Sequence, residues 1–206
     1  MGWTWYNASH YDKHGKIDRR AECDAYFTEG FNEGWYKVEK SAMVGSVYYA
    51  AVRPLRSFVG DCNKSEPIPE SEQFVFAAVF LTSTDVQSFY NFGYKDMDET
   101  MGPGPVDCPI GILNLLSPTD NESANAWREC CRQRASEKKA MKKNQKDLDI
   151  LPIGTVIKCG DTELVKSGPK AQLKKPFWLV VGKNTYYTKK YILKSGYEII
   201  FKPEKI

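Results

Sequence analysis

The sequence predicts an α+β fold: an N-terminal antiparallel sheet with helices, a long basic helix, and a small C-terminal β-barrel of SH3-like or OB-like type. Two observations indicate this. Strand-like runs separated by turn residues surround one helical pattern early in the chain, and short strands punctuated by glycine return at its end. We expect an acidic α+β domain over residues 1–127, a basic helix or linker over 128–148, and a small basic β-barrel over 149–206.

The first elements are a strand and a helix. An aromatic, β-prone run predicts a strand over residues 3–8. Asp18 is placed to cap a helix that runs to about Glu29, and Gly30 would end it. Apolar residues at helical spacing support this helix: Ala21, Ala25, Cys23 and Phe27.

Four further runs predict the strands of the N-terminal sheet. Residues 35–40 alternate, residues 46–52 are rich in β-prone side chains, and residues 73–82 form a nearly continuous apolar run. Another strand is expected over 89–94. Polar residues and prolines predict a loop over 61–71.

The middle of the chain turns from irregular to helical. Residues 95–108 contain two prolines and two glycines within four positions, which excludes a helix or a central strand. Residues 110–116 predict a short helix or turn. Ser117 as N-cap and Pro118 at the first helical position predict the start of a helix that continues toward Lys146.

The C-terminal part contains four strand-like runs, at residues 151–158, 177–181, 186–187 and 197–201. Trp178 is expected in the core of the barrel that they would form. Three tyrosines stay open between core packing and stacking on unpaired bases: Tyr186, Tyr187 and Tyr191.

The charge is sorted along the chain. Residues 1–127 carry 10 Lys and Arg against 18 Asp and Glu, a formal −8, whereas residues 128–206 carry 19 against 8, a formal +11. Such asymmetry concerns partners and not the fold. The basic part would meet nucleic acid through phosphate contacts. The acidic part would repel nucleic acid or occupy a basic protein groove.

The long helix is the main candidate for nucleic-acid binding, because eight of its nineteen residues from 128 to 146 are Lys or Arg. The alternative is a solvated linker helix, although a surface helix usually mixes both signs of charge. The predicted nucleic-acid-binding residues are Arg132, Arg134, Lys138, Lys139, Lys142, Lys143, Lys174, Lys175, Lys189 and Lys190.

One loop holds the groups that a metal-independent ribonuclease needs. His10 would deprotonate a 2′-hydroxyl, while Arg19 and Arg20 would steady the phosphorane. The alternative, which the single sequence favours, is an ordinary polar loop before a helix capped by Asp18.

Four acids, Asp96, Asp98, Glu99 and Asp107, lie in the irregular segment. Their oxygens suit Mg²⁺ or Ca²⁺, but their spacing does not match a calcium-binding loop. We expect them to form a charged turn or to contact a basic protein groove. Six cysteines without a C-x-x-C pair and two histidines predict reduced thiols in a cytoplasm, with no metal and no cofactor.

Several classes of protein are excluded or disfavoured. Phosphate-binding, dinucleotide, zinc-protease and serine-hydrolase motifs are absent, which disfavours a metabolic enzyme. The start of the sequence has no secretory signal, and no run approaches 18 apolar residues. We therefore expect a cytoplasmic protein without a membrane partner.

Three stretches resemble an uncharacterised family of small proteins carried by conjugative elements, plasmids and phages of Gram-positive bacteria. They are Met1–Thr4, Gly15–Asp24, and the block from Tyr94–Met97 to Leu115–Asp120. The resemblance covers most of residues 1–157, including Leu151–Thr155. It implies an accessory protein that blunts host defence, most plausibly an anti-CRISPR inhibitor of a type II Cas9 effector.

Such an inhibitor would engage Cas9, or another host defence protein, together with guide RNA or another nucleic acid. Its acidic part would face the positively charged channel that holds the guide–target heteroduplex. Two alternatives stay open: a general nucleic-acid-binding accessory protein of a mobile element, and a metal-independent ribonuclease acting on guide RNA.

Overall fold

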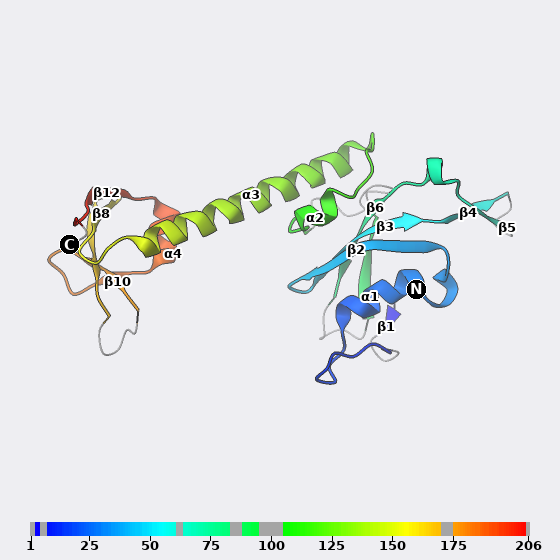
Figure 1. The fold of residues 1–206 in the computed structure, drawn as a ribbon, viewed down its shortest axis with the longest axis horizontal. Coiled ribbons are helices and arrows are strands. Elements are labelled where there is room, and N and C mark those ends of the chain that lie inside the picture. The colour runs from blue at the N-terminus through cyan, green and yellow to red at the C-terminus, as the bar shows by residue number, and fades with distance from the viewer. Residues whose placement is uncertain are drawn as a thin grey trace. The chain divides into compact units, whose positions relative to one another are not determined.

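The computed structural model describes residues 3–4, 8–60, 64–82, 88–94, 105–169 and 175–204, with 3–4 and 88–94 described by their backbone alone. The chain divides into two compact units, residues 1–135 and 136–206. The described part is a mixed α and β structure with antiparallel sheets and four α-helices (Figure 1). The sorting of charge follows this division: unit 1 carries 13 Lys and Arg against 19 Asp and Glu, and unit 2 carries 16 against 7.

Unit 1 is built on a five-stranded antiparallel sheet with the order β1-β7-β6-β3-β2. The central pair β3 and β6 is in register over six residue pairs, from Val47 opposite Leu81 to Val52 opposite Phe76. The strands are β1 (Trp3–Thr4), β2 (Tyr36–Val44), β3 (Val47–Pro54), β6 (Phe76–Leu81) and β7 (Ser88–Tyr94). The predicted antiparallel sheet is thus confirmed.

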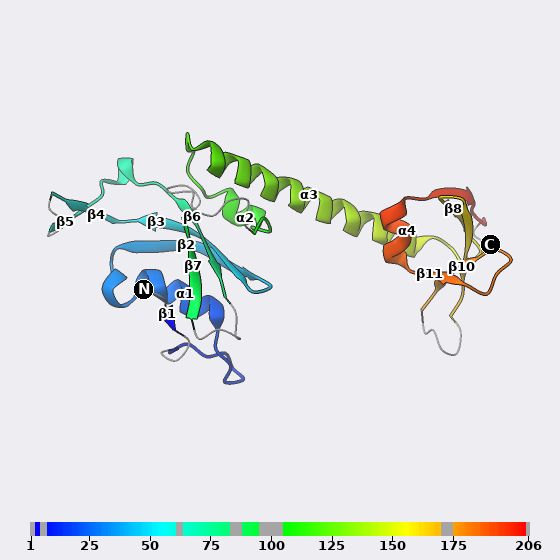
Figure 2. The same ribbon diagram turned by 180° about the vertical axis from the view of Figure 1, so that it is seen from behind.

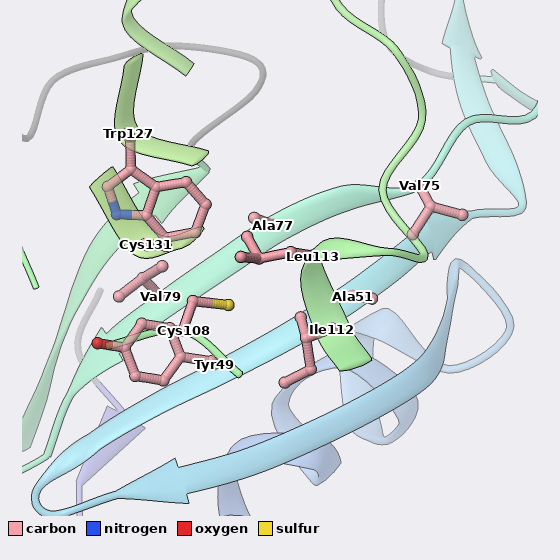
Figure 3. Close-up of a cluster of buried hydrophobic side chains, with 10 residues drawn as sticks. All are labelled: Tyr49, Ala51, Val75, Ala77, Val79, Cys108, Ile112, Leu113, Trp127 and Cys131. Carbon is pink, nitrogen blue, oxygen red and sulfur yellow. The ribbon is translucent and has the colours of Figure 1, made fainter. Parts of the chain in front are cut away.

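The central strands are buried on both faces, which explains the continuous apolar run in the sequence. Along β3, Tyr48 and Ala50 pack on one side, whereas Tyr49 and Ala51 pack on the other. Helix α1 (Arg19–Thr28) covers the first face. The second face is covered by α2 (Ile110–Leu113) and by the first turns of α3 (Glu122–Ile150) (Figures 1 and 3).

Helix α1 begins as the sequence predicts. The Asp18 side chain accepts hydrogen bonds from the backbone N–H groups of Arg20 and Ala21, at 3.1 and 3.0 Å. These bonds satisfy two donors that the first turn of a helix leaves free. The helix ends at Thr28, with Glu29 as C-cap, and a single 3₁₀ turn, η2 (Gly30–Asn32), follows.

The loop predicted over residues 61–71 is partly wrong. Residues Lys64–Pro67 form strand β5, which pairs with β4 (Arg56–Val59) in a separate two-stranded sheet, and η3 (Glu70–Glu72) is a 3₁₀ turn. Arg56 stabilises this hairpin by donating to the hydroxyl and the carbonyl of Ser65, at 3.1 and 2.8 Å. Short polar strands that contain proline are hard to recognise from sequence. This pairing also depends on hydrogen bonds between Arg56 and Ser65, which are nine residues apart.

The predicted start of the long helix at Ser117 is also wrong, because α3 begins at Glu122. Asn121 caps the helix, with its side-chain oxygen accepting from the N–H of Ala124 at 2.9 Å. Ser117 instead exchanges hydrogen bonds with Val75, whose N–H donates to the Ser117 hydroxyl and whose carbonyl accepts from its N–H, both at 2.9 Å. Ser117 therefore binds Val75, the residue just before β6, and does not start a helix.

Unit 2 contains a five-stranded antiparallel sheet with the order β11-β10-β9-β8-β12. Its elements are β8 (Val156–Cys159), β9 (Thr162–Ser167), β10 (Phe177–Val180), β11 (Tyr186–Tyr187), α4 (Lys189–Ser195) and β12 (Glu198–Phe201). In the described residues, β11 and β12 do not pair, so the sheet stays open and the predicted closed barrel is not observed. Trp178 is 1% exposed, which confirms its place in the core.

The sequence did not predict β9 or α4. Helix α4 takes up the chain that would otherwise extend β11, with Thr188 as N-cap and Gly196 after its last residue. Gly196 has a φ of 76°, which a glycine adopts without strain. Because β11 is only two residues long, it offers little edge for closing a barrel.

Within the described residues, no helix is long and apolar enough to cross a membrane. The five described cysteines are free thiols: Cys23, Cys108, Cys130, Cys131 and Cys159.

Candidate nucleic-acid interface

Helix α3 is held by buried side chains near both of its ends. Trp127 and Cys131 pack into the core of unit 1, beside Cys108 and Tyr49 (Figure 3), and the Trp127 indole N–H donates to the carbonyl of Pro105 at 2.9 Å. At the other end, Leu148 is fully buried in the core of unit 2. Residues 136–147 between these anchors are all exposed.

The arginines on the first part of α3 form hydrogen bonds or ion pairs with other residues of unit 1. Arg128 is 6% exposed and donates to the carbonyl of Ser117 at 2.8 Å. Arg134 lies 3.6 Å from the Asp107 carboxylate, and Arg132 lies 4.0 Å from Glu129, one turn earlier on the helix. Two predicted nucleic-acid contacts, Arg132 and Arg134, therefore have carboxylate partners within unit 1.

The lysines on the second part of α3 form a continuous basic face. With 3.6 residues per turn, five lysine side chains project within an arc of about 140°. The arc is centred roughly 150° from the direction of Leu148, so it points away from the core of unit 2. We call this set the lysine face: Lys138, Lys139, Lys142, Lys143 and Lys146.

The lysine face is open to solvent. All five side chains are exposed, and in the described part of the chain Lys139, Lys142, Lys143 and Lys146 have no ion pair. Lysines four positions apart repel each other, and each such pair destabilises a helix by about 0.2–0.5 kcal/mol. A helix that needed only solubility would avoid this cost by mixing signs.

A buried lysine supports the end of the helix that carries this face. Lys166, on β9, is 4% exposed and its ammonium donates to the carbonyls of Leu148, Asp149 and Leu151 at 3.3, 2.6 and 2.6 Å. It thereby satisfies carbonyls that a helix end leaves free. Burial lowers the pKa of Lys166, the Asp149 carboxylate opposes this shift and Lys189 adds to it.

Helix α4 continues the basic surface next to the lysine face. The Lys189 ammonium forms an ion pair with Asp149, whose side chain projects within about 20° of Lys142 around α3. This pair joins the N-terminus of α4 to the C-terminal end of α3, next to the lysine face. Figure 2 shows α4 beside this end of α3. Lys190 and Lys194 on α4 are exposed.

Two exposed aromatic rings accompany these cations. Tyr191 on α4 is 51% exposed and Tyr186 on β11 is 56% exposed. Tyr187 is half-buried against the core and contacts Tyr191 edge to face, with ring centroids 4.7 Å apart. Of the three tyrosines left open by the sequence, Tyr186 and Tyr191 are therefore available to a ligand.

Two further lysines, Lys174 and Lys175, were predicted to contact nucleic acid. Lys175 is exposed, whereas Lys174 lies outside the described residues. The structure adds Lys146 and Lys194, which were not among the predicted contacts. The 3.6-residue period would have found Lys146, which projects between Lys142 and Lys139.

The predicted acidic contact surface is only partly described. Asp96, Asp98 and Glu99 lie outside the described residues. Asp107 is half-buried and pairs with Arg134, and its N–H donates to the Tyr49 hydroxyl at 3.2 Å. Asp107 therefore joins the irregular segment to α3 and to the sheet.

His10 is held between two carboxylates, Glu22 of α1 and Glu29, the C-cap of that helix. Its Nδ1 lies 3.1 Å from the buried Glu22 carboxylate, and its Nε2 lies 3.3 Å from Glu29. Glu22 also accepts from the N–H groups of Ser9 and His10, both at 2.5 Å, which ties the loop to the helix. Arg19 donates to the carbonyl of Thr82 at 3.5 Å.

Arg20, the other predicted cation of the ribonuclease hypothesis, is exposed.

A second carboxylate of α1, Asp24, accepts from the Tyr48 and Ser41 hydroxyls at 2.7 and 3.0 Å. Burial and the Asp24 charge raise the pKa of Tyr48 and of the Cys23 thiol. The Tyr48 phenol and the Cys23 thiol therefore stay neutral. The hydrogen bonds from Tyr48 and Ser41 to Asp24 join α1 to the sheet.

Within the described residues, no three His, Cys, Asp or Glu side chains are grouped closely enough to hold a metal ion. Comparison with protein-family models, with curated proteins and with solved structures found no match for this chain.

Proposed function

We propose that this chain binds nucleic acid through the lysine face and α4, as an anti-defence protein of a mobile element. The observation that carries the proposal is the open lysine face, where like charges accumulate on one side of an exposed helix at a cost to its stability. A phosphate backbone would neutralise these charges and remove that repulsion, while the lysines would release counterions condensed on the nucleic acid. Local features that cost stability without a structural return commonly mark functional sites.

The exposed tyrosines beside α4 favour a strand with unpaired bases over a duplex. Aromatic rings stack on any base while neighbouring cations neutralise phosphates, and each stacked base contributes about 1–3 kcal/mol. Tyr191 and Lys190 are adjacent on α4, so both contacts are available at one place. Guide RNA of a type II Cas9 effector is the ligand that the resemblance to mobile-element proteins favours.

The acidic unit 1 supports the Cas9 proposal by its charge alone. Its formal −6 would suit the positively charged channel that holds the guide–target heteroduplex. The ribonuclease hypothesis has less support, because both ring nitrogens of His10 lie near carboxylates. If Cas9 is not a partner, the alternative function is that of a general nucleic-acid-binding accessory protein of a mobile element.

The test is fluorescence anisotropy with a 20-nucleotide RNA and a 20-base-pair DNA over a series of salt concentrations. We expect tighter binding to the RNA, and neutralising four lysines should reduce the slope of log affinity against log salt by about 3. The variant is Lys139→Gln, Lys142→Gln, Lys143→Gln and Lys146→Gln. A control with the same loss of charge in unit 1 should bind like the unmodified protein: Lys13→Gln, Lys16→Gln, Lys40→Gln and Lys64→Gln.

Equal losses in the two variants would contradict the assignment of the lysine face. A second assay measures target cleavage by Cas9 with the protein in excess, added before or after guide RNA. We expect inhibition that the lysine-face variant loses and the control variant keeps. Normal cleavage at high excess would remove Cas9 from the proposal and leave nucleic-acid binding to be judged by anisotropy.

A further inference from the structure

The last strand of unit 2 is an apolar edge. In the described part of the chain β12 pairs only with β8, and every residue of β12 is exposed. Ile199, Ile200 and Phe201 are 44, 51 and 56% exposed. An edge strand presents unpaired N–H and C=O groups, and proteins usually protect such edges with charged side chains. Three consecutive exposed apolar residues leave the centre of this edge without that protection.

The backbone of β12 is irregular at the centre of the strand. Ile199 lies opposite Ile157 and Phe201 opposite Val156, so Ile200 is the extra residue of a β-bulge. A bulge leaves the backbone of its extra residue outside the ladder. Ile200 therefore has polar backbone groups that β8 does not use.

We propose that β12 pairs with β12 of a second copy of this chain, antiparallel and centred on Ile200. The charges flanking the strand select this partner and this register. With Ile200 on the two-fold axis, Glu198 lies opposite Lys202 of the second copy, and Lys202 lies opposite its Glu198. Opposite charges facing across an antiparallel pair are stabilising, and like charges are destabilising. A shift by one residue would remove both pairs.

The bulge and the short length of β12 limit this interface. A stable interface usually buries at least about 1,000 Å², more than a strand pair of five residues provides. We therefore expect a dimer that dissociates in the micromolar range. Because the lysine face lies in the same unit, the dimer would present two basic surfaces to one nucleic acid, which raises the apparent affinity.

The test is sedimentation velocity of the full chain over a concentration series without nucleic acid. All variants are made in a Lys158→Gln background, because Lys158 of β8 lies opposite Glu198 in the same chain. Glu198→Lys then places like charges opposite each other at two symmetric positions of the dimer and should weaken dimerisation roughly tenfold. The double variant Glu198→Lys with Lys202→Glu restores both opposite-charge pairs and should restore the dimer. Asp161→Lys, an equal charge change at an exposed turn, should leave dimerisation unchanged.

Circular dichroism of each variant checks that unit 2 stays folded, and rescue by the double variant separates a pairing effect from a folding defect. A chain that is monomeric at every concentration overturns the proposal. A dimer that Glu198→Lys leaves intact, or that the double variant does not restore, overturns it as well.

Discussion

The two units use their cations differently. In unit 1, Arg53 and Lys37 share the Glu39 carboxylate, Arg134 pairs with Asp107, and Arg128 binds a backbone carbonyl. In unit 2, the lysine face of α3 stays open over Lys139, Lys142, Lys143 and Lys146. The same helix carries both patterns, so its basic composition alone does not show which cations are free for a ligand.

The chemistry of the two cations agrees with this division. Arginine presents a planar fork of donors that suits buried or geometrically defined partners, whereas lysine is a strongly hydrated point charge on a flexible stem. The three basic residues at the start of α3 are arginines and the five that follow are lysines. Lys166 departs from the pattern, because it is a lysine buried among carbonyls.

Replacing Lys166 should have the largest effect among the variants that test whether the two units use their cations differently. We expect Lys166→Met to destabilise unit 2 by about 3 kcal/mol, because it removes charge-assisted hydrogen bonds and leaves buried carbonyls without donors. Hydrogen exchange should show faster opening of β8 and β9 and unchanged protection of β3 and β6. Lys183→Met, which changes an exposed lysine in the turn after β10, serves as the control and should leave protection unchanged.

Arg128 and Lys142 test the two halves of α3 directly. Arg128→Met should lower the free energy of unfolding by about 2 kcal/mol, because the carbonyl of Ser117 loses the donor that Arg128 provides. Lys142→Met should change it by less than about 0.5 kcal/mol. Chemical denaturation followed by circular dichroism measures both. Equal effects would show that the open lysines also have a structural role.

Replacing Glu39 should have a smaller effect than replacing Lys166 or Arg128, and it tests how the cations of unit 1 are paired. The hydrogen bond from Arg53 lowers the pKa of Glu39, with Lys37 adding to the shift and burial opposing it. The resulting stabilisation is complete above the ordinary glutamate pKa of about 4.3 and is lost as pH falls through the lowered value. Glu39→Gln should cost about 1 kcal/mol at pH 7 and little near pH 2, measured by denaturation at each pH.

A Glu39→Gln penalty that persists unchanged at pH 2 would contradict an electrostatic origin. Ser57→Ala, a neutral change at an exposed strand position, provides the baseline for such small differences.

Strong local signals in the sequence predicted much of unit 1. The apolar run over residues 73–82 predicts β6 because its alternate residues pack on opposite faces of the sheet, and Asp18 marks the start of α1 through its own side chain. The start of α3 was missed because Ser117 has a partner, Val75, that is 42 residues away in sequence. Only the folded chain shows that Ser117 forms hydrogen bonds with the residue just before β6.

The sequence also located the basic region of the candidate site, but it did not distinguish its members. Arg134 and Lys142 look equivalent in a count of charges, and only the folded chain shows Asp107 near Arg134. Helix α4 and strand β9 were missed because short elements carry little periodicity. Without α4, the position of Tyr191 beside Lys190 on one short helix could not be foreseen.

The boundary between the units, after Ala135, falls inside α3 and not in a loop. Any fragment made to study one unit alone must therefore cut a helix. A C-terminal piece that starts after residue 150 would lose Leu148 from its core and two of the three carbonyls that accept from Lys166. One that starts near Ser136 keeps both, and it also keeps the whole basic surface for binding studies with the smaller half of the molecule.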